Sequence, residues 1–130
     1  MKAETREWIQ FAEADYDTAC HLWRKRGGRL ARAICFHCQQ CLEKYFKARL
    51  IEAGLRCPET NDLKRLVDLL VATEPLLAAY RPVLGPLTAA YEIQFRQAGE
   101  LDLQQNAKDA LKTCRAIRTE VRASLGLPKK

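Results

Sequence analysis

The chain has 130 residues, of which 48% are hydrophobic and 29% charged, with a net charge of +6 and a pI of about 9.1. This composition excludes an intrinsically disordered chain and suits one globular domain, residues 1–130. No apolar run approaches the roughly 20 residues of a membrane span, and the N-terminus, MKAETREWIQ, lacks a secretion signal. We therefore expect a cytoplasmic protein without membrane contact. Its basic excess favours an acidic or phosphate-bearing partner, and the alternative is a mixed-charge surface that is simply solvated.

Two long helices are predicted in the first half of the chain. The first runs from about Ala3 to Arg26 and ends at Gly27-Gly28, because glycine readily adopts the left-handed conformation that closes a helix. The second begins at about Arg29 or Arg32 and ends near Gly54. The apolar residues expected on their core faces are Trp8, Phe11, Ala12, Tyr16, Ala19 and Trp23 in the first helix and Ile34, Cys38, Cys41, Leu42, Tyr45, Ala48 and Ile51 in the second.

The second half of the chain predicts shorter helices interrupted by proline and glycine. Thr60 or Asn61 can cap a third helix, DLKRLVDLLVAT, and a short helix follows Pro75. After a break at residues 82–86, a fourth helix is expected from about Pro86 to Phe95, followed by a loop at residues 97–101. Asp102 is the expected cap of the final helix, which ends at Gly126. The core positions expected here are Leu63, Leu66, Val67, Leu69 and Leu70 in the third helix and Leu103, Ala107, Ala110, Leu111, Cys114, Ile117, Val121 and Leu125 in the last.

No alternating strand pattern and no internal repeat is present. Four or five helices with short connections predict the all-α class, as an up-and-down antiparallel helical bundle. Six cysteines in helical pattern are expected to be reduced core residues. Cys35, Cys38 and Cys41 superficially match an iron–sulfur spacing, but no fourth cysteine follows them in a loop. We therefore expect no metal and no cofactor.

A line of polar residues along the second predicted helix is the candidate ligand-binding site. His37, Gln40 and Lys44 lie about one turn apart, so an imidazole, an amide and an ammonium can converge on one phosphate, and Lys47 continues the line. The simpler interpretation of His37 is a hydrogen-bonded structural histidine, because a lone histidine on such a helix more often has that role. His21 has no such neighbours and is expected on the surface. Nothing in the chain makes a stand-alone enzyme obvious, because Gly-rich phosphate loops, Ser-His-Asp sets and HExxH are all missing from the sequence.

Two further segments are candidates for phosphate contacts. Tyr91 and Arg96 lie near the end of the fourth predicted helix, where Arg96 either contacts phosphate or pairs with an acid such as Glu43. Arg32 and His37 have the spacing of an arginine–histidine pair that cleaves RNA, in which histidine transfers a proton and arginine stabilises the phosphorane. The simpler interpretation of Arg32 is a solvent-exposed arginine in the first turn of a helix.

The order of these motifs resembles a HEPN (higher eukaryotes and prokaryotes nucleotide-binding) domain of the small prokaryotic type, over nearly the whole chain. The central segment, CFHCQQCLEKYFKARLIEAG, is similar to the central motif of that family, with Cys38 and Cys41 where alanine is usual. The remaining resemblance lies at Trp8, Ala12, Asp15 and Ala19, at Asn61, Asp62, Leu63 and Leu66, and at residues 91–96.

The resemblance implies a homodimeric helical bundle that pairs with a minimal nucleotidyltransferase in a toxin–antitoxin system and binds nucleotide or RNA phosphate. His37, Gln40 and Lys44 would contact the ligand, with Tyr91 and Arg96 completing the pocket. Other members of the family are metal-independent ribonucleases with an Arg-x4-6-His motif. Here no histidine follows Arg96 within six residues, so a ribonuclease using Arg32 and His37 is the alternative, and a non-catalytic structural dimerisation protein is the second.

Overall fold

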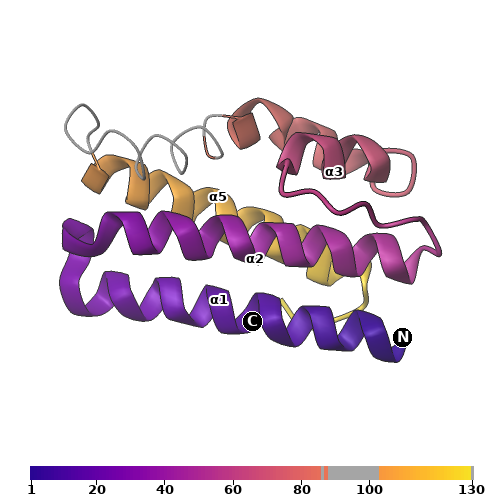
Figure 1. Cartoon of the computed structure of the whole chain (residues 1–130), viewed down its shortest axis with the longest axis horizontal. Helices are drawn as coiled ribbons and strands as arrows, with labels where there is room; N and C mark the ends of the chain where they lie inside the picture. Colours follow the sequence, from indigo (N-terminus) through magenta and orange to yellow (C-terminus); the bar gives the residue numbers. More distant parts are fainter. Residues whose placement is uncertain (86, 88–102, 130) are drawn as a thin grey trace.

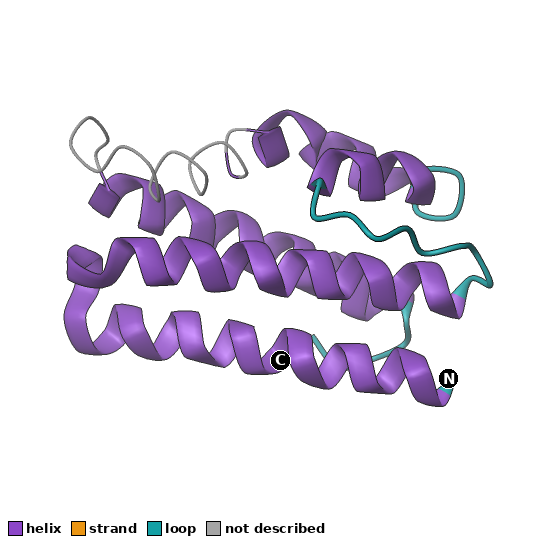
Figure 2. Ribbon diagram, viewed as in Figure 1, coloured by secondary structure: helices purple, strands orange, loops and turns teal. Residues whose placement is uncertain are grey.

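Three long helices, packed side by side, carry the fold (Figures 1 and 2). The computed structural model describes residues 1–85, 87 and 103–129. Its helices are α1 (Ala3–Arg26), α2 (Ala31–Glu52), α3 (Leu63–Leu70) and α5 (Leu103–Ser124), with 3₁₀ turns η1 (Gly27–Leu30) and η2 (Pro75–Tyr80) and further helix at 81–85. No strand occurs in this described part, which confirms the all-α helical bundle.

Helix α2 lies at the centre because its sequence is apolar around much of its circumference. It contacts α1, α3 and α5, whereas α1 and α5 contact each other only slightly. Twelve of its 22 residues are buried, more than one apolar stripe would need. The polar side chains that α2 also carries are therefore forced into the interfaces between helices.

Glycines with positive φ close α2 and α5. After α2, Gly54 has φ +73° and donates to the carbonyl of Ile51, while Leu55 donates to Leu50. After α5, Gly126 has the same φ, and Leu127 donates to the carbonyl of Arg122. Both are Schellman motifs, which turn the chain back along the helix it has just left.

Several local predictions were wrong in detail. Phe11 is 51% exposed, because Ile9 takes the core position one turn before Ala12. Leu69 is 43% exposed on the outer side of α3. The N-cap of α3 is Asp62, whose carboxylate accepts hydrogen bonds from the first-turn amides of the helix. Pro82 does not interrupt the chain, since proline fits the first turn of the helix at residues 81–85.

The predictions for the segment before α5 lie outside the described residues. They are the fourth helix from Pro86 to Phe95, the loop at 97–101 and the Asp102 cap. None of the described helices is long and apolar enough to cross a membrane.

All six cysteines are free, as predicted. Cys35, Cys38, Cys41 and Cys114 are fully buried, and Cys114 of α5 lies against Cys38 and Cys41 of α2, whereas Cys20 and Cys57 are partly exposed. Burial raises the pKa of the Cys41 thiol, which keeps it neutral. No group of three or more His, Cys, Asp or Glu side chains that could hold a metal occurs within the described ranges.

Thiol labelling of the native chain at pH 8 should modify Cys20 and Cys57 at least about tenfold faster than the four buried cysteines, which react only after local opening. Peptide mapping after a short pulse of iodoacetamide measures the difference. In guanidinium chloride all six should react alike. Equal rates in the native chain would contradict the buried placement.

Candidate functional site

His37 and Lys44 on α2 both contact one carboxylate on α1. His37 Nδ1 lies 2.8 Å from Asp15 Oδ1, and the Lys44 ammonium donates to Asp15 Oδ2. The Asp15 side chain is 11% exposed, and those of His37 and Lys44 are 27% and 23% exposed. We call these three residues the Asp15 site. The structure thus brings together two of the residues predicted from sequence and adds an acid from the neighbouring helix.

The contacts of the Asp15 site leave hydrogen-bonding capacity for a ligand. An ammonium has three N–H donors, and the bond to Asp15 uses one of them. His37 binds Asp15 through Nδ1, so Nε2 is a second position, on the far side of the ring. Because Asp15 fixes both side chains, an anion at this edge would find the free N–H groups of Lys44 and, in the protonated imidazole, the Nε2–H of His37 already oriented.

The other members of the predicted polar line have different partners. Gln40 donates to the side chain of Gln39, which in turn donates to the carbonyl of Asn61. Lys47 lies 3.4 Å from Glu43 and its ammonium stands over the Trp8 ring. Of the four polar residues in the predicted line, His37 and Lys44 therefore share a partner, Asp15, whereas Gln40 and Lys47 have other partners.

The remaining predicted residues do not join the Asp15 site in the described part of the chain. Tyr91 and Arg96 lie outside the described residues. Arg32 is exposed in the first turn of α2 and His21 is exposed on α1, as predicted. Because α2 is continuous from Ala31 to Glu52 and each residue turns a helix by about 100°, Arg32 and His37 project about 140° apart.

A second polar group, missed by the sequence analysis, lies between α1, α2 and α5. We call it the Glu13 cluster; it consists of Glu13, Tyr45, Arg118 and Arg122. Arg118 binds both carboxylate oxygens of Glu13, at 2.6 and 2.7 Å. The Tyr45 hydroxyl donates to Glu13 at 2.5 Å and accepts from Arg122 at 3.1 Å. Arginine makes such bidentate contacts because its donors match the spacing of a carboxylate.

In the Glu13 cluster the pKa of Glu13 is lowered and the pKa of Tyr45 is raised. Burial would raise the pKa of Glu13, but hydrogen bonds from Arg118 and Tyr45 outweigh it and hold the pKa below the ordinary value of 4.5. Burial and the bond to Glu13 raise the pKa of Tyr45, which stays a neutral phenol. The cluster is therefore an ionised acid with two cations at neutral pH.

Positive charge is concentrated at the turn between α1 and α2. Residues 18–42 contain five Lys and Arg and no Asp or Glu, leaving 17 Lys and Arg against 16 Asp and Glu in the rest of the chain. All five are exposed, and we call them the basic corner: Arg24, Lys25, Arg26, Arg29 and Arg32. Nearly the whole net charge of +6 thus lies in this one segment, where it would attract a polyanion.

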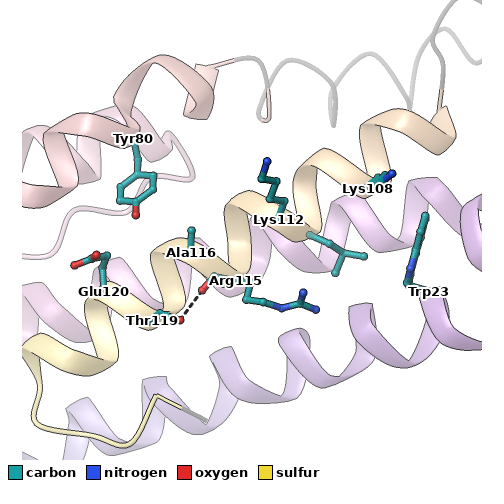
Figure 3. A pocket seen from close by; sticks show the side chains of 9 residues that line it. Trp23, Tyr80, Lys108, Lys112, Arg115, Ala116, Thr119 and Glu120 are labelled. Atoms are coloured by element: carbon teal, nitrogen blue, oxygen red, sulfur yellow. Dashed lines mark hydrogen bonds between the residues drawn. The ribbon is translucent and has the colours of Figure 1, made fainter.

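A hollow of about 620 Å³ lies along the outer face of α5. Figure 3 shows Lys108, Lys112 and Arg115 along α5, with Trp23 from α1 on one side and Tyr80 from η2 on the other. The Arg115 guanidinium donates to the Tyr16 hydroxyl at 3.0 Å. Among the described residues predicted to bind ligand, His37, Gln40 and Lys44 do not line this hollow, so it does not coincide with the Asp15 site.

Part of what the sequence analysis missed has a signal in the helical register. Asp15 falls between Ala12 and Ala19 at the spacing of the buried face of α1, and a charged residue there needs a buried partner. Arg118 and Arg122 follow Cys114 at intervals of four on the buried side of α5. The basic corner could have been found in the sequence, because residues 18–42 contain no Asp or Glu.

The arrangement of the helices and the two polar groups between them define the class of protein: a small all-α bundle domain with paired charges in its helix interfaces. The family model of the HEPN domain matches residues 5–124. The chain belongs to the HEPN domain family. No curated protein and no solved structure gives a significant match to it.

Replacing Asp15 with asparagine should lower the free energy of unfolding by about 1–3 kcal/mol, because two charge-assisted contacts lose their anion. Urea denaturation measures the change. The same substitution at Asp17, which is exposed on α1, should stay within about 0.5 kcal/mol. Equal effects of the two substitutions would show that the Asp15 contacts contribute nothing to stability.

Proposed function

We propose that this chain is a non-catalytic HEPN module that binds the phosphate of a nucleotide or of RNA at the Asp15 site. The observation that carries the proposal is the convergence of His37 and Lys44 on one side chain, Asp15, at a partly exposed helix edge. Gln40 lies one turn from His37, and we propose that Tyr91 and Arg96, which lie outside the described residues, complete the pocket. The ligand would share the donors of His37 and Lys44 with Asp15.

The charge distribution supports an anionic ligand. The basic corner lies at the N-terminal end of α2, the helix that carries His37 and Lys44. An approaching polyanion would therefore meet positive potential near the Asp15 site. Attraction of this kind raises the rate of association and weakens as salt is added. It does not select a base sequence, because phosphate contacts carry none.

The proposal includes two protein partners. One is a minimal nucleotidyltransferase, with which this chain would form a toxin–antitoxin-like pair. The other is a second copy of the chain. We propose that this copy packs against the exposed apolar side chains Leu69, Leu76 and Val83. Light scattering after size exclusion measures the homodimer. Co-purification with a nucleotidyltransferase encoded beside the chain measures the pair.

The ribonuclease alternative has less support in this geometry. Arg32 and His37 project to different sides of α2, so one chain does not direct both at the same phosphate. Metal-independent cleavage of RNA that is abolished by His37→Ala would favour the alternative over the binding module.

Titration of the purified chain with ATP and with a short RNA tests the binding site. His37→Ala and Lys44→Ala should each weaken binding by about tenfold or more, since each removes a direct contact of the proposed site with the phosphate. His21→Ala is the matched control, because His21 is exposed on α1, and it should bind like the parent. No binding by the parent, or equal binding by all four chains, would exclude the Asp15 site.

A further inference from the structure

The Glu13 cluster contains two arginines and one glutamate, so it carries excess positive charge, and its arginines are largely buried. Its two guanidinium groups have side-chain exposures of 7% for Arg118 and 10% for Arg122. Both share the carboxylate of Glu13, which lies 3.4 Å from Arg122 Nη1. The one carboxylate neutralises one of the two guanidinium groups. The second positive charge has only neutral hydrogen-bond acceptors around it within the cluster. Such an arrangement is costly to bury unless further acceptors satisfy the donors.

Backbone carbonyls of the segment after α5 are these acceptors. Arg122 Nε donates to the carbonyl of Pro128 at 2.5 Å, and Arg118 Nη1 donates to the carbonyl of Lys129 at 2.9 Å. The Schellman turn at Gly126 allows these two hydrogen bonds, because it directs residues 127–129 back along α5 toward Arg118 and Arg122. Figure 1 shows the C-terminal segment leaving the end of α5 and turning toward α1.

We propose that Arg118 and Arg122 form a binding site for a phosphate group, which residues 127–129 occlude by lending their carbonyls to the two arginines. A carbonyl carries only a partial negative charge, whereas a phosphate carries a full charge and several acceptor oxygens. A guanidinium–phosphate contact joins two full charges and can be bidentate, so it is stronger than the bond from the same guanidinium to a neutral carbonyl. A phosphate would therefore replace the two carbonyls and lift the segment from α5.

The surroundings of the pair keep both arginines in place when the segment leaves. Arg118 keeps its two bonds to Glu13 and stacks over the Tyr16 ring at 4.4 Å. Arg122 keeps the Tyr45 hydroxyl. The donors released are thus preorganised, and the phosphate does not have to order them. This site is separate from the Asp15 site and does not depend on the proposed function.

The test compares the parent with a chain that ends at Leu127 as a C-terminal amide, so that no new carboxylate faces Arg122, using inorganic phosphate at constant ionic strength. Phosphate should raise the thermal midpoint of the shortened chain by about twice as many degrees as that of the parent, or more, because only the parent must first displace its own carbonyls. Lys129→Ala, which keeps the carbonyl and loses an exposed side chain, should respond like the parent. Arg122→Gln in the shortened chain should remove the added response, whereas His37→Ala should keep it.

A measurement on the full chain covers the case in which the shortened chain does not fold. In NMR spectra of the parent, phosphate should shift the Nε–H signals of Arg118 and Arg122. The amide of Leu127 should lose its folded position in the same titration. Equal thermal responses of parent and shortened chain, a response that survives Arg122→Gln, or arginine shifts with an unchanged Leu127 signal would each overturn the proposal.

Discussion

Replacing Glu13 with alanine should lower the free energy of unfolding by about 3 kcal/mol, because removal of one partner leaves the others buried without a counter-charge. Arg118 and Arg122 would lose their common carboxylate, and the Tyr45 hydroxyl would lose its acceptor. The Glu13 side chain is 26% exposed, so water enters the gap and the loss lies at the low end of the range for buried ion pairs. Urea denaturation at pH 7 measures it.

Glu7→Ala is the matched control for this substitution, because Glu7 is an exposed acid on the same helix. It should change the free energy of unfolding by no more than about 0.5 kcal/mol. If Glu13→Ala also stayed below about 1 kcal/mol, the bidentate contact with Arg118 would contribute little.

The same carboxylate makes stability depend on pH at the acid end. The folded pKa of Glu13 lies below its ordinary value of 4.5, so its contribution is present above that value. It is lost as the pH falls through the folded pKa, because the unfolded chain binds the proton more readily. In Glu13→Gln this part of the acid loss should be missing when urea midpoints are compared between pH 5 and pH 3.

Replacing Leu42 with alanine should cost about 2–5 kcal/mol, since it opens a cavity at the centre of the bundle. Leu42 is fully buried on α2, the helix that contacts α1, α3 and α5. Urea denaturation should show a lower midpoint with an unchanged slope, as expected when stability changes and the exposed surface does not.

Leu69→Ala supplies the matched comparison, because it removes the same atoms from a side chain that is 43% exposed. Its cost should stay within about 0.5 kcal/mol. Similar losses at both positions would mean that α3 is covered at Leu69, for instance by a second copy of the chain.

The helix boundaries were predictable because local signals agree with one another. The first helix was predicted from Ala3 to Arg26 and has those bounds, since Gly27-Gly28 closes a long periodic segment. The end of α2 before Gly54 was equally clear. The buried cysteines of α2 also followed from their helical spacing. In each case neighbours in the sequence determine the result.

The pairing of polar residues was not predictable in the same way. The sequence places His37 and Lys44 on one side of a helix, but the rotation of α1 against α2 decides that Asp15 stands opposite them. The Glu13 cluster depends likewise on α5, whose Arg118 is 105 residues away from Glu13. Such contacts follow from how whole helices pack, which periodicity alone does not specify.

The short η1 turn between α1 and α2 has a consequence for how the chain folds. The long interface between these helices joins neighbours in the sequence, so little loop entropy is lost when they meet. Contacts with α5 require closure of most of the chain. Local pairing of this kind favours rapid folding, with the α1–α2 hairpin as an early scaffold onto which α5 docks. The Asp15 contacts would then form before the Glu13 cluster.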